Sequence, residues 1–389
     1  MSAAGPVRPV YLDNAATTAV DPRVAAVMAE CLTEGGVFGN AASTTHPYGR
    51  EAAARIEAAR ADVAGLVGAQ PGEIVFTSGA TEASNLAILG TARANADRRR
   101  HLVTVRTEHR ATLDPMRQLE KEGYSVTWLT PDRDGRVTAG AVRAVLRPET
   151  LLASVMHVNN ETGAVQDVVA IGEACRAAGV LFHSDLAQGV GKLPTPFADR
   201  LDFASFTAHK IHGPKGIGAL FVAATARAWI APIVFGGGQE RGLRSGTLPT
   251  HQIAGFGCAC GLARAEGDAD ATRMGALRAT LWKSLEGLPG ARLNSPLADG
   301  SPAILNVSFE GVEGESLVAA LDGIAVSTGS ACSSATGEPS YVLRALGRDP
   351  ELAQGSLRFS LGRYTTAADI ERAGDAVRRA VTRLRGAAP

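Results

Sequence analysis

Lysine is scarce in this chain, which has five lysines among its 39 basic residues, so arginine carries nearly all of the positive charge. Two of the five, Lys210 and Lys215, nevertheless lie within six positions of each other in the stretch SFTAHKIHGPKG (205–216). An arginine would serve as a surface charge, whereas an amine that loses its proton and forms a C=N bond must come from lysine. The use of lysine here therefore indicates a chemical role.

Other features that the sequence lacks exclude several classes of protein. The 39 basic residues are balanced by 39 acidic ones, so the charge does not indicate a nucleic-acid or membrane partner. No run approaches about 18 uninterrupted apolar residues, and the N-terminus lacks the basic start and apolar core of a secretion signal. We therefore expect a cytoplasmic protein that binds neither nucleic acid nor membrane.

Cysteine is also sparse. The five cysteines are odd in number and scattered, which argues against a disulfide framework. Cys258 and Cys260 have the wrong spacing for a zinc knuckle and lie in the apolar run IAGFGCACGLARA, so we expect them to pack in the core on a buried helix and predict no resident metal site.

Between about residues 73 and 223, short apolar runs alternate with helical stretches. These runs are rich in β-branched and aromatic residues, which predicts a mostly parallel sheet covered by helices on both faces. The predicted strands are 73–78, 101–105, 125–130, 151–157, 180–185, 202–208 and 218–223.

After about residue 262 the pattern changes to a long Arg/Leu/Ala-rich helix (262–287), two further strands and a terminal helix. This predicts an α/β chain with two parts. Residues 16–261 would form a large domain that binds a cofactor, and residues 1–15 with 262–389 a smaller α+β domain.

Five of the seven predicted strands end in groups that bind or react. In open α/β sheets, ligands bind outside the carboxyl ends of the strands. Taken singly, each group has an ordinary structural explanation, such as a glycine turn, a loop histidine, a capping aspartate or a surface lysine. All of these ordinary explanations would have to hold together at the same sheet edge, which is much less probable than any one of them alone. The groups are Gly79-Ala80-Thr81, Thr107-Glu108-His109, Asn159-Asn160-Glu161, Asp185 with Gln188, and Thr207-Ala208-His209-Lys210.

One cofactor, pyridoxal phosphate, accounts for all five groups together. It requires a lysine for its Schiff base, an anion site for its phosphate and a carboxylate on its pyridine nitrogen. Lys210 and Asp185 fit the first and last of these roles, and Gln188 fits the ring hydroxyl. A flat side chain such as His109 would stack on the ring. The glycine turn before a helix, with Thr207 and His209, would bind the phosphate.

The sequence also closely resembles the cysteine desulfurases of the NifS/IscS type, in the class V aminotransferase fold group. The likeness runs from Tyr11 to about Leu384, and chance does not explain motifs of this length and number. They include YLDNAATT, EIVFTSGATEASNLAI, TEHRATLD, HVNNETGAVQD, HSDLAQGVGKLP, AHKIHGPKGIGAL, GGGQERGLRSGTLP, STGSACSS and LRFSLGR.

The resemblance implies a homodimeric pyridoxal-phosphate enzyme of fold type I. Such an enzyme takes sulfur from L-cysteine, leaves L-alanine and passes the sulfur to an acceptor such as an iron–sulfur scaffold protein. Cys332 in the loop STGSACSS would carry the sulfur as a persulfide, with transient iron–sulfur ligation through the same thiol, and a Gly/Ser/Thr-rich loop suits an exposed thiol.

The resemblance also assigns the other site residues. The catalytic residues would be Cys332, Lys210, which forms the Schiff base, and His109, which stacks on the ring and moves protons. Arg358 and Asn160 would bind the substrate, and Arg358 would bind the carboxylate of the substrate. The cofactor would be held by Asn160, Asp185 and Gln188 at the ring and by Ala80, Thr81, Thr207, His209 and, from the other subunit, Thr247 at the phosphate.

Some features depart from the relatives. Thr207 and Ala208 precede the His-Lys pair where many relatives have Ser-Gly, His212 replaces a tyrosine, and the chain ends without the C-terminal extension that housekeeping relatives use to bind a scaffold protein. Two other functions fit: a selenocysteine lyase or another β-elimination enzyme of the same fold, and a non-catalytic platform for sulfur-transfer proteins. The acceptor pathway is open between iron–sulfur assembly, tRNA thiolation and a nitrogenase-linked pathway.

Overall fold

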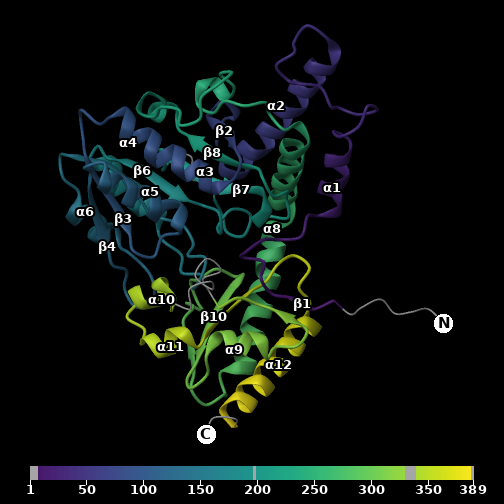
Figure 1. The fold of residues 1–389 in the computed structure, drawn as a ribbon, viewed down its shortest axis with the longest axis vertical. Helices are drawn as coiled ribbons and strands as arrows, with labels where there is room; N and C mark the ends of the chain where they lie inside the picture. Colours follow the sequence, from purple (N-terminus) through teal and green to yellow (C-terminus); the bar gives the residue numbers. More distant parts are fainter. Residues whose placement is uncertain (1–7, 196–198, 329–338, 387–389) are drawn as a thin grey trace.

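The computed structural model describes residues 8–195, 199–328 and 339–386. Its larger part is a seven-stranded sheet of order β2-β8-β7-β6-β5-β3-β4 (Figure 1). β3 to β7 pair in parallel, and β8 runs antiparallel to both of its neighbours, which confirms the predicted sheet. The strands are β2 Ile74–Thr77, β3 His101–Val105, β4 Ser125–Leu129, β5 Thr150–Ser154, β6 Leu181–Asp185, β7 Phe203–Thr207 and β8 Gly218–Val222.

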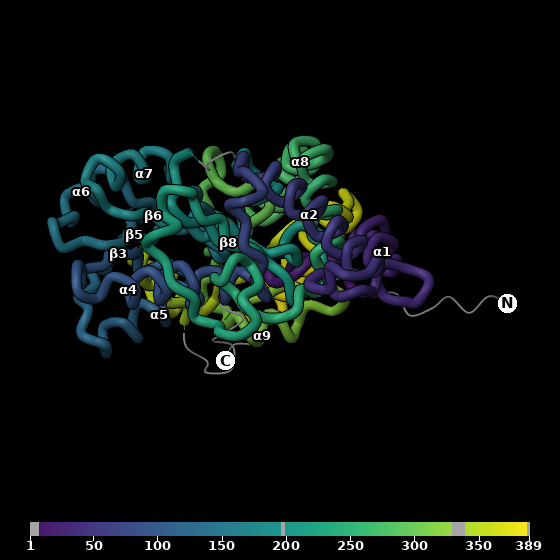
Figure 2. The backbone as a smooth tube through the Cα atoms, turned by 90° about the horizontal axis from the view of Figure 1, so that it is seen from above, coloured from purple at the N-terminus to yellow at the C-terminus, as the bar shows by residue number. Residues whose placement is uncertain are grey.

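Helices cover both faces of this sheet, which explains why its central strands are buried and mostly apolar. Every residue of β3, β5 and β7 is buried. Figure 2 shows α6 and α7 on one side of the sheet and α4 and α5 on the other. The covering helices are α3 Ala80–Asn85, which continues through a π-helical turn (Leu86–Gly90) into α4 Thr91–Ala94, then α5 Arg110–Lys121, α6 Ala139–Val145 and α7 Val168–Ala177.

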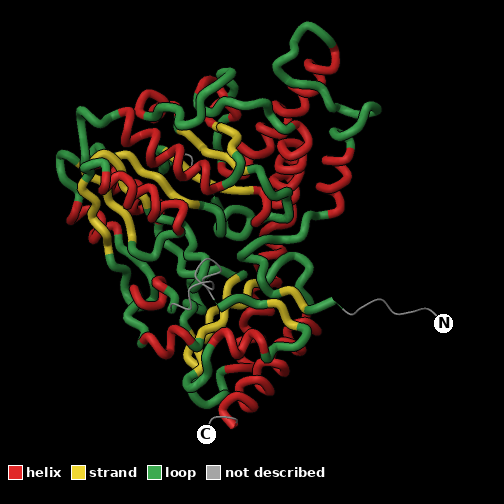
Figure 3. The backbone as a smooth tube through the Cα atoms, viewed as in Figure 1, coloured by secondary structure: helices red, strands yellow, loops and turns green. Residues whose placement is uncertain are grey.

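A smaller α+β part lies beside the carboxyl edge of the large sheet (Figure 3). Its antiparallel sheet has the order β12-β10-β9, and β1 pairs in parallel with β11, so the N-terminal strand joins this part. The elements are β1 Val10–Tyr11, β9 Ala291–Leu293, β10 Ile304–Phe309, β11 Ile324–Ala325, β12 Ser356–Ser360, α9 Gly314–Ala319, α10 Tyr341–Ala345, α11 Pro350–Gln354 and α12 Ala367–Gly386.

One long helix, α8 (Thr250–Leu285), connects the two parts. Its first half, up to Ala263, packs in the hydrophobic core of the large sheet, and residues from Met274 onward pack in the core of the smaller part. The helix begins at Thr250, before residue 262, where the sequence placed the start of the Arg/Leu/Ala-rich helix, and it includes the apolar run that was expected to form a buried helix. The predicted domain boundary at residues 261 and 262 lies inside this helix.

Two further helices, α1 (Pro22–Ala29) and α2 (Pro47–Val67), pack against α8. A buried ion pair fastens α2 to the sheet. Arg60 makes two hydrogen bonds of 2.8 Å to Glu240, whose carboxylate also accepts a hydrogen bond from the backbone N–H of Phe76 in β2. No helix among the described residues is long and apolar enough to cross a membrane.

Candidate active site

Most of the predicted site residues line one cavity of about 490 Å³ at the carboxyl edge of the large sheet. They come from the ends of separate strands, which parallel pairing brings to the same edge. The smaller part closes the cavity with Arg358 from β12, and the N-terminal segment adds Ala15 and Ala16. The predicted residues in this cavity are Ala80, Thr81, His109, Asn160, Asp185, Gln188, Thr207, His209, Lys210 and Arg358.

Lys210 ends a short 3₁₀ turn, Ala208–Lys210, directly after β7. Its ammonium group donates hydrogen bonds to the carbonyl of Ala16 at 2.7 Å and to that of Ala15. The chain then turns sharply. A Cβ on Gly213 would lie 2.7 Å from the side chain of Ala208, so only glycine fits at this point. The turn holds the amine inside the cavity.

Asp185 lies at the end of β6 with 5% of its surface exposed. Its carboxylate accepts a hydrogen bond of 2.8 Å from the backbone N–H of Ala187. Burial raises the pKa of this carboxyl, while the nearby His109 and Lys210 lower it. A buried carboxylate of this kind gains from a cationic partner, such as a protonated ring nitrogen, at the wall of the cavity.

His109 caps the N-terminus of α5. Its Nδ1 accepts a hydrogen bond of 3.1 Å from the backbone N–H of Ala111, so the neutral ring carries its proton on Nε2. Burial lowers the pKa of this imidazole, although Asp185 opposes the shift. Burial therefore favours the neutral form of His109 near Asp185 and Lys210.

Arg358 is 3% exposed and lines the cavity from β12. Its guanidinium lies 2.7 Å from the carboxylate of Asp13 and 3.0 Å from the carbonyl of Asn160. The amide oxygen Oδ1 of Asn160 is buried and has no hydrogen-bond partner among the described residues. Sequence reasoning missed Asp13, although it lies in the quoted motif YLDNAATT.

The opposite end of the cavity suits an anion in part. Ala80 and Thr81 begin the helical segment that starts with α3, and backbone N–H groups at such a start attract anions. His209 has Nδ1 3.1 Å from the hydroxyl of Thr17, and burial followed by nearby lysines lowers its pKa to about 4. The hydroxyl of Thr207 instead donates to the carbonyl of Ile217 at 3.0 Å.

A lysine amine, a buried carboxylate and a helix start around one cavity fit pyridoxal phosphate. Two predicted residues fall outside this arrangement. Thr247 is exposed and does not line the cavity, so its predicted role requires a second subunit. Cys332 lies outside the described residues.

Two further side chains near the cavity were not predicted. Tyr341 lines the cavity and donates a hydrogen bond of 2.8 Å to the carbonyl of Glu108. Ser340 donates to the buried carboxylate of Glu161. Both belong to the first turn of α10 or its cap, and only tertiary packing brings this turn to the end of β3 and the loop after β5.

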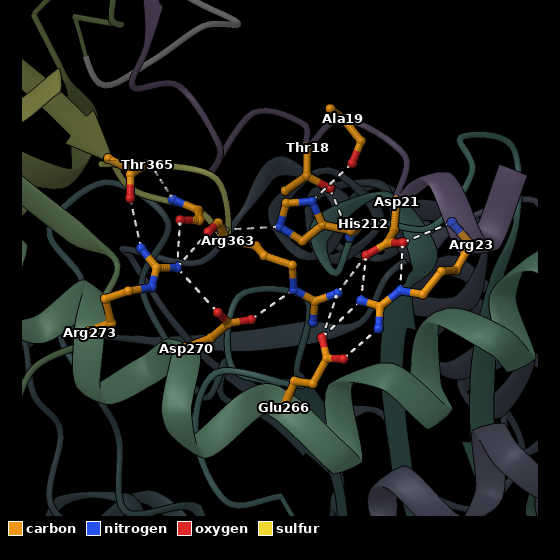
Figure 4. Close-up of polar contacts among 11 residues, drawn as sticks. Thr18, Ala19, Asp21, Arg23, His212, Glu266, Asp270, Arg273, Arg363 and Thr365 are labelled. Atoms are coloured by element: carbon orange, nitrogen blue, oxygen red, sulfur yellow. Dashed lines mark hydrogen bonds and ion pairs between the residues drawn. The ribbon is translucent and has the colours of Figure 1, made fainter. Parts of the chain in front are cut away.

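His212, whose role the sequence left open, joins three segments (Figure 4). Its Nδ1 lies 2.9 Å from the carbonyl of Ala19, and its Nε2 lies 3.3 Å from the backbone N–H of Arg363. The ring is therefore neutral with its proton on Nδ1, and burial lowers its pKa. Arg363 pairs in turn with Asp21 and Asp270 at 2.8 Å each. His212 thus fastens the lysine turn to the segment before α1 and to the loop after β12.

Comparison with known proteins agrees with this geometry. The chain matches the Aminotransferase class-V family over residues 10–373. It is 52% identical to cysteine desulfurase IscS of Salmonella schwarzengrund (strain CVM19633) over 382 residues. This aligned region covers 98% of this chain and 95% of that protein. Among solved structures, a NifS-like protein is 36% identical with a TM-score of 0.89, covering 97% of this chain and 99% of the other. The protein SspA, in complex with cysteine, is 35% identical with a TM-score of 0.80, covering 92% of this chain and 99% of the other.

The fold and the cavity define a pyridoxal-phosphate enzyme, and the chain belongs to the class-V aminotransferase family. Its cofactor is pyridoxal 5′-phosphate. Within that family, the similarity over nearly the whole chain is to cysteine desulfurases of the IscS type.

Proposed function

We propose that this protein is a cysteine desulfurase, which converts L-cysteine to L-alanine and holds the sulfur as a persulfide on Cys332 before a protein acceptor takes it. The observation that carries the proposal is the single cavity in which Lys210, Asp185 and Arg358 meet from three separate elements. The 52% identity to cysteine desulfurase IscS over nearly the whole chain supports the same conclusion.

In this reaction Arg358 binds the carboxylate of L-cysteine. A guanidinium matches a carboxylate with two parallel N–H donors, which fixes the orientation of the amino acid as well as its affinity. Because Arg358 comes from the smaller part and Lys210 from the large sheet, a substrate bound between them lies at the junction of the two. Asn160 contributes an amide at the same wall.

Pyridoxal phosphate, when bound, supplies an aldehyde that condenses with amines and a protonated ring that accepts negative charge from the substrate Cα. Lys210 would hold the cofactor at rest and, once freed by the substrate, move the proton of the substrate Cα. Asp185 would keep the ring nitrogen protonated, and Gln188 would donate to the ring hydroxyl. His109, neutral with its proton on Nε2, would move a second proton near the sulfur.

Cys332 would accept the sulfur. Its thiolate attacks the substrate sulfur, an S–S bond forms, and the C–S bond breaks with its electron pair left on the substrate carbon, which takes up a proton and becomes the methyl group of alanine. The described cysteines do not suit this role. Burial raises the pKa of the Cys175 thiol to about 12 and that of the Cys260 thiol well above its usual value.

The active unit would be a homodimer in the cytoplasm. Thr247 is exposed in this chain, and from a second subunit it would complete the phosphate site. An iron–sulfur scaffold protein is the proposed acceptor, with tRNA thiolation and a nitrogenase-linked pathway as the alternatives. Light scattering of the holoenzyme tests the dimer, and a monomer with full cofactor occupancy would contradict it.

The decisive experiment supplies L-cysteine to the purified protein and measures alanine, sulfide and the visible spectrum. We expect a yellow protein that forms alanine and sulfide in equal amounts in the presence of a reductant. A colourless, inactive protein would indicate a non-catalytic platform. A protein that turns over L-selenocysteine but not L-cysteine would indicate a selenocysteine lyase.

A further inference from the structure

A second lysine is buried behind Lys210. Lys192 follows β6 in the turn that also carries Gln188, and only 9% of its surface is exposed. With Lys210 it lines a small internal cavity of about 20 Å³, which is separate from the main one. An ammonium group loses most of its hydration at such a site, and the reaction described above does not use Lys192.

A continuous chain of hydrogen bonds connects the two lysines. The Nζ of Lys192 donates to Oε1 of Gln188 at 3.3 Å, and Nε2 of Gln188 donates to the carbonyl of Ala15 at 2.8 Å. The ammonium of Lys210 donates to the same carbonyl. Lys192 therefore reaches Lys210 through one amide and one carbonyl.

This chain determines which way the Gln188 amide points. An amide has an accepting oxygen at one end and a donating nitrogen at the other. Lys192 presents N–H donors to the oxygen end, and the Ala15 carbonyl accepts only from the nitrogen end. The NH₂ end of Gln188 thus lies on the side of Lys210. The positive end of that dipole disfavours an ammonium group at Lys210 and favours the neutral amine.

Several other charged groups surround Lys192. Lys210 and His212 face it from the lysine turn, Asp270 from α8 and Arg363 from the loop after β12, and His209 is near enough to be affected by its charge. Burial, and secondarily Lys210, lowers the pKa of Lys192 to about 7. Its direct charge effect on Lys210 is therefore weak above neutral pH, whereas its N–H groups donate in either protonation state.

We propose that Lys192 is a positioning residue, which orients the Gln188 amide with its NH₂ end toward Lys210 and so keeps the Lys210 amine ready to react. Gln188 is also the residue that would donate to the cofactor hydroxyl, and any effect of Lys192 on that hydroxyl rests on the proposed function. The part that concerns the Lys210 amine does not, because the hydrogen-bonded chain involves only side chains and backbone of this protein.

The test measures the amine itself, in protein freed of cofactor. Lys210 is labelled with a small amine reagent over a range of pH, and the labelled peptide is quantified by mass spectrometry. In Lys192→Met the amide oxygen loses its donor, so only the Ala15 carbonyl still holds the amide in its present orientation, and the orientation with the oxygen toward Lys210 becomes more populated. We expect the midpoint pH of labelling to rise by about one unit, which means about tenfold less labelling below the midpoint.

Matched variants separate this role from others. Lys283→Met removes an exposed lysine of α8 and should leave the midpoint unchanged. Lys192→Arg retains a donor for the amide oxygen, and its permanent charge also disfavours an ammonium group at Lys210, so the midpoint should not rise above that of wild type. In a Gln188→Leu background, Lys192→Met should add no further shift, because its effect passes through the amide.

Gln188→Glu gives an independent arm if Lys192→Met does not fold. It places an oxygen beside Lys210 whatever Lys192 does, so the midpoint should rise by at least as much. A midpoint that stays unchanged in Gln188→Glu, or in a folded Lys192→Met, would overturn the inference. So would a Lys192→Met shift of the same size with and without Gln188.

The holoenzyme supplies a second readout. The visible absorption of bound cofactor, titrated with pH, should shift its midpoint upward in Lys192→Met. A purely structural role for Lys192 predicts lower stability and an unshifted titration, whereas removal of a buried ammonium should leave the urea midpoint unchanged or raised. Absence of desulfurase activity in wild-type protein would contradict the proposed function without affecting the labelling of Lys210.

Discussion

Replacement of Arg358 by lysine tests how the substrate is bound. The arginine is 3% exposed, and its guanidinium already contacts Asp13 at 2.7 Å and the carbonyl of Asn160 at 3.0 Å. It therefore lies in a fixed orientation at the cavity wall before any substrate arrives. Lysine retains the charge at this position but has no planar fork to match a carboxylate.

The size of the effect follows from the contacts that are lost. A hydrogen bond to a charged group contributes about 1.5–3 kcal/mol, and Arg358→Lys should lose one of the two bonds to the substrate carboxylate. This corresponds to a fall of about 10- to 150-fold in kcat/KM. The loss should appear mainly as a raised KM, because the carboxylate is bound equally in the ground state and the transition state.

The assay follows alanine formation as a function of L-cysteine concentration, with the cofactor content of each variant measured by absorbance. Asp13→Asn is the matched control, since it removes the ion-pair partner and leaves the arginine in place. Its KM should be unchanged or lower, because the substrate then competes with no carboxylate. A wild-type kcat/KM in Arg358→Lys would refute the assignment of Arg358 to the substrate carboxylate.

Three further variants test other parts of the molecule. Lys210→Ala should lose both turnover and the borohydride-reducible link to the cofactor, while Lys121→Ala should keep both; the reverse result would overturn the lysine assignment. Cys332→Ala should still bind pyridoxal phosphate and change colour with L-cysteine but release almost no sulfide, and near-normal desulfuration would exclude the persulfide role. Glu240→Gln breaks the buried ion pair of α2 and should lower the free energy of unfolding in urea by about 3 kcal/mol. A change below 1 kcal/mol would show that the pair contributes little.

The sheet was predictable because its signals are local. Runs such as HLVTV at 101–105 are dominated by apolar and β-branched residues, and the structure buries every residue of β3. Parallel pairing then places the residues after each strand at one edge, so His109, Asp185 and Lys210 could be assigned to a common site before their distances were known. The scarcity of lysine drew attention to Lys210 in particular.

The start of α8 was predicted less well. Most residues between Ile253 and Cys260 are buried, so the apolar run IAGFGCAC shows little of the periodic alternation that marks a helix with one solvent-facing side. Only the packing of this stretch against α1 and α2 shows that it is continuous with the Arg/Leu/Ala-rich helix that follows.

The amino-acid sequence by itself determined the strands, most of the helices and the chemical identities of the groups at the sheet edge, since each depends on neighbours along the chain. Tertiary structure alone decided which partner each group meets. Asp13 pairs with Arg358 across 345 positions, and Gln188 bonds to Ala15 across 173. Contacts at such separations arise when segments far apart in the sequence pack side by side, and no local pattern encodes them.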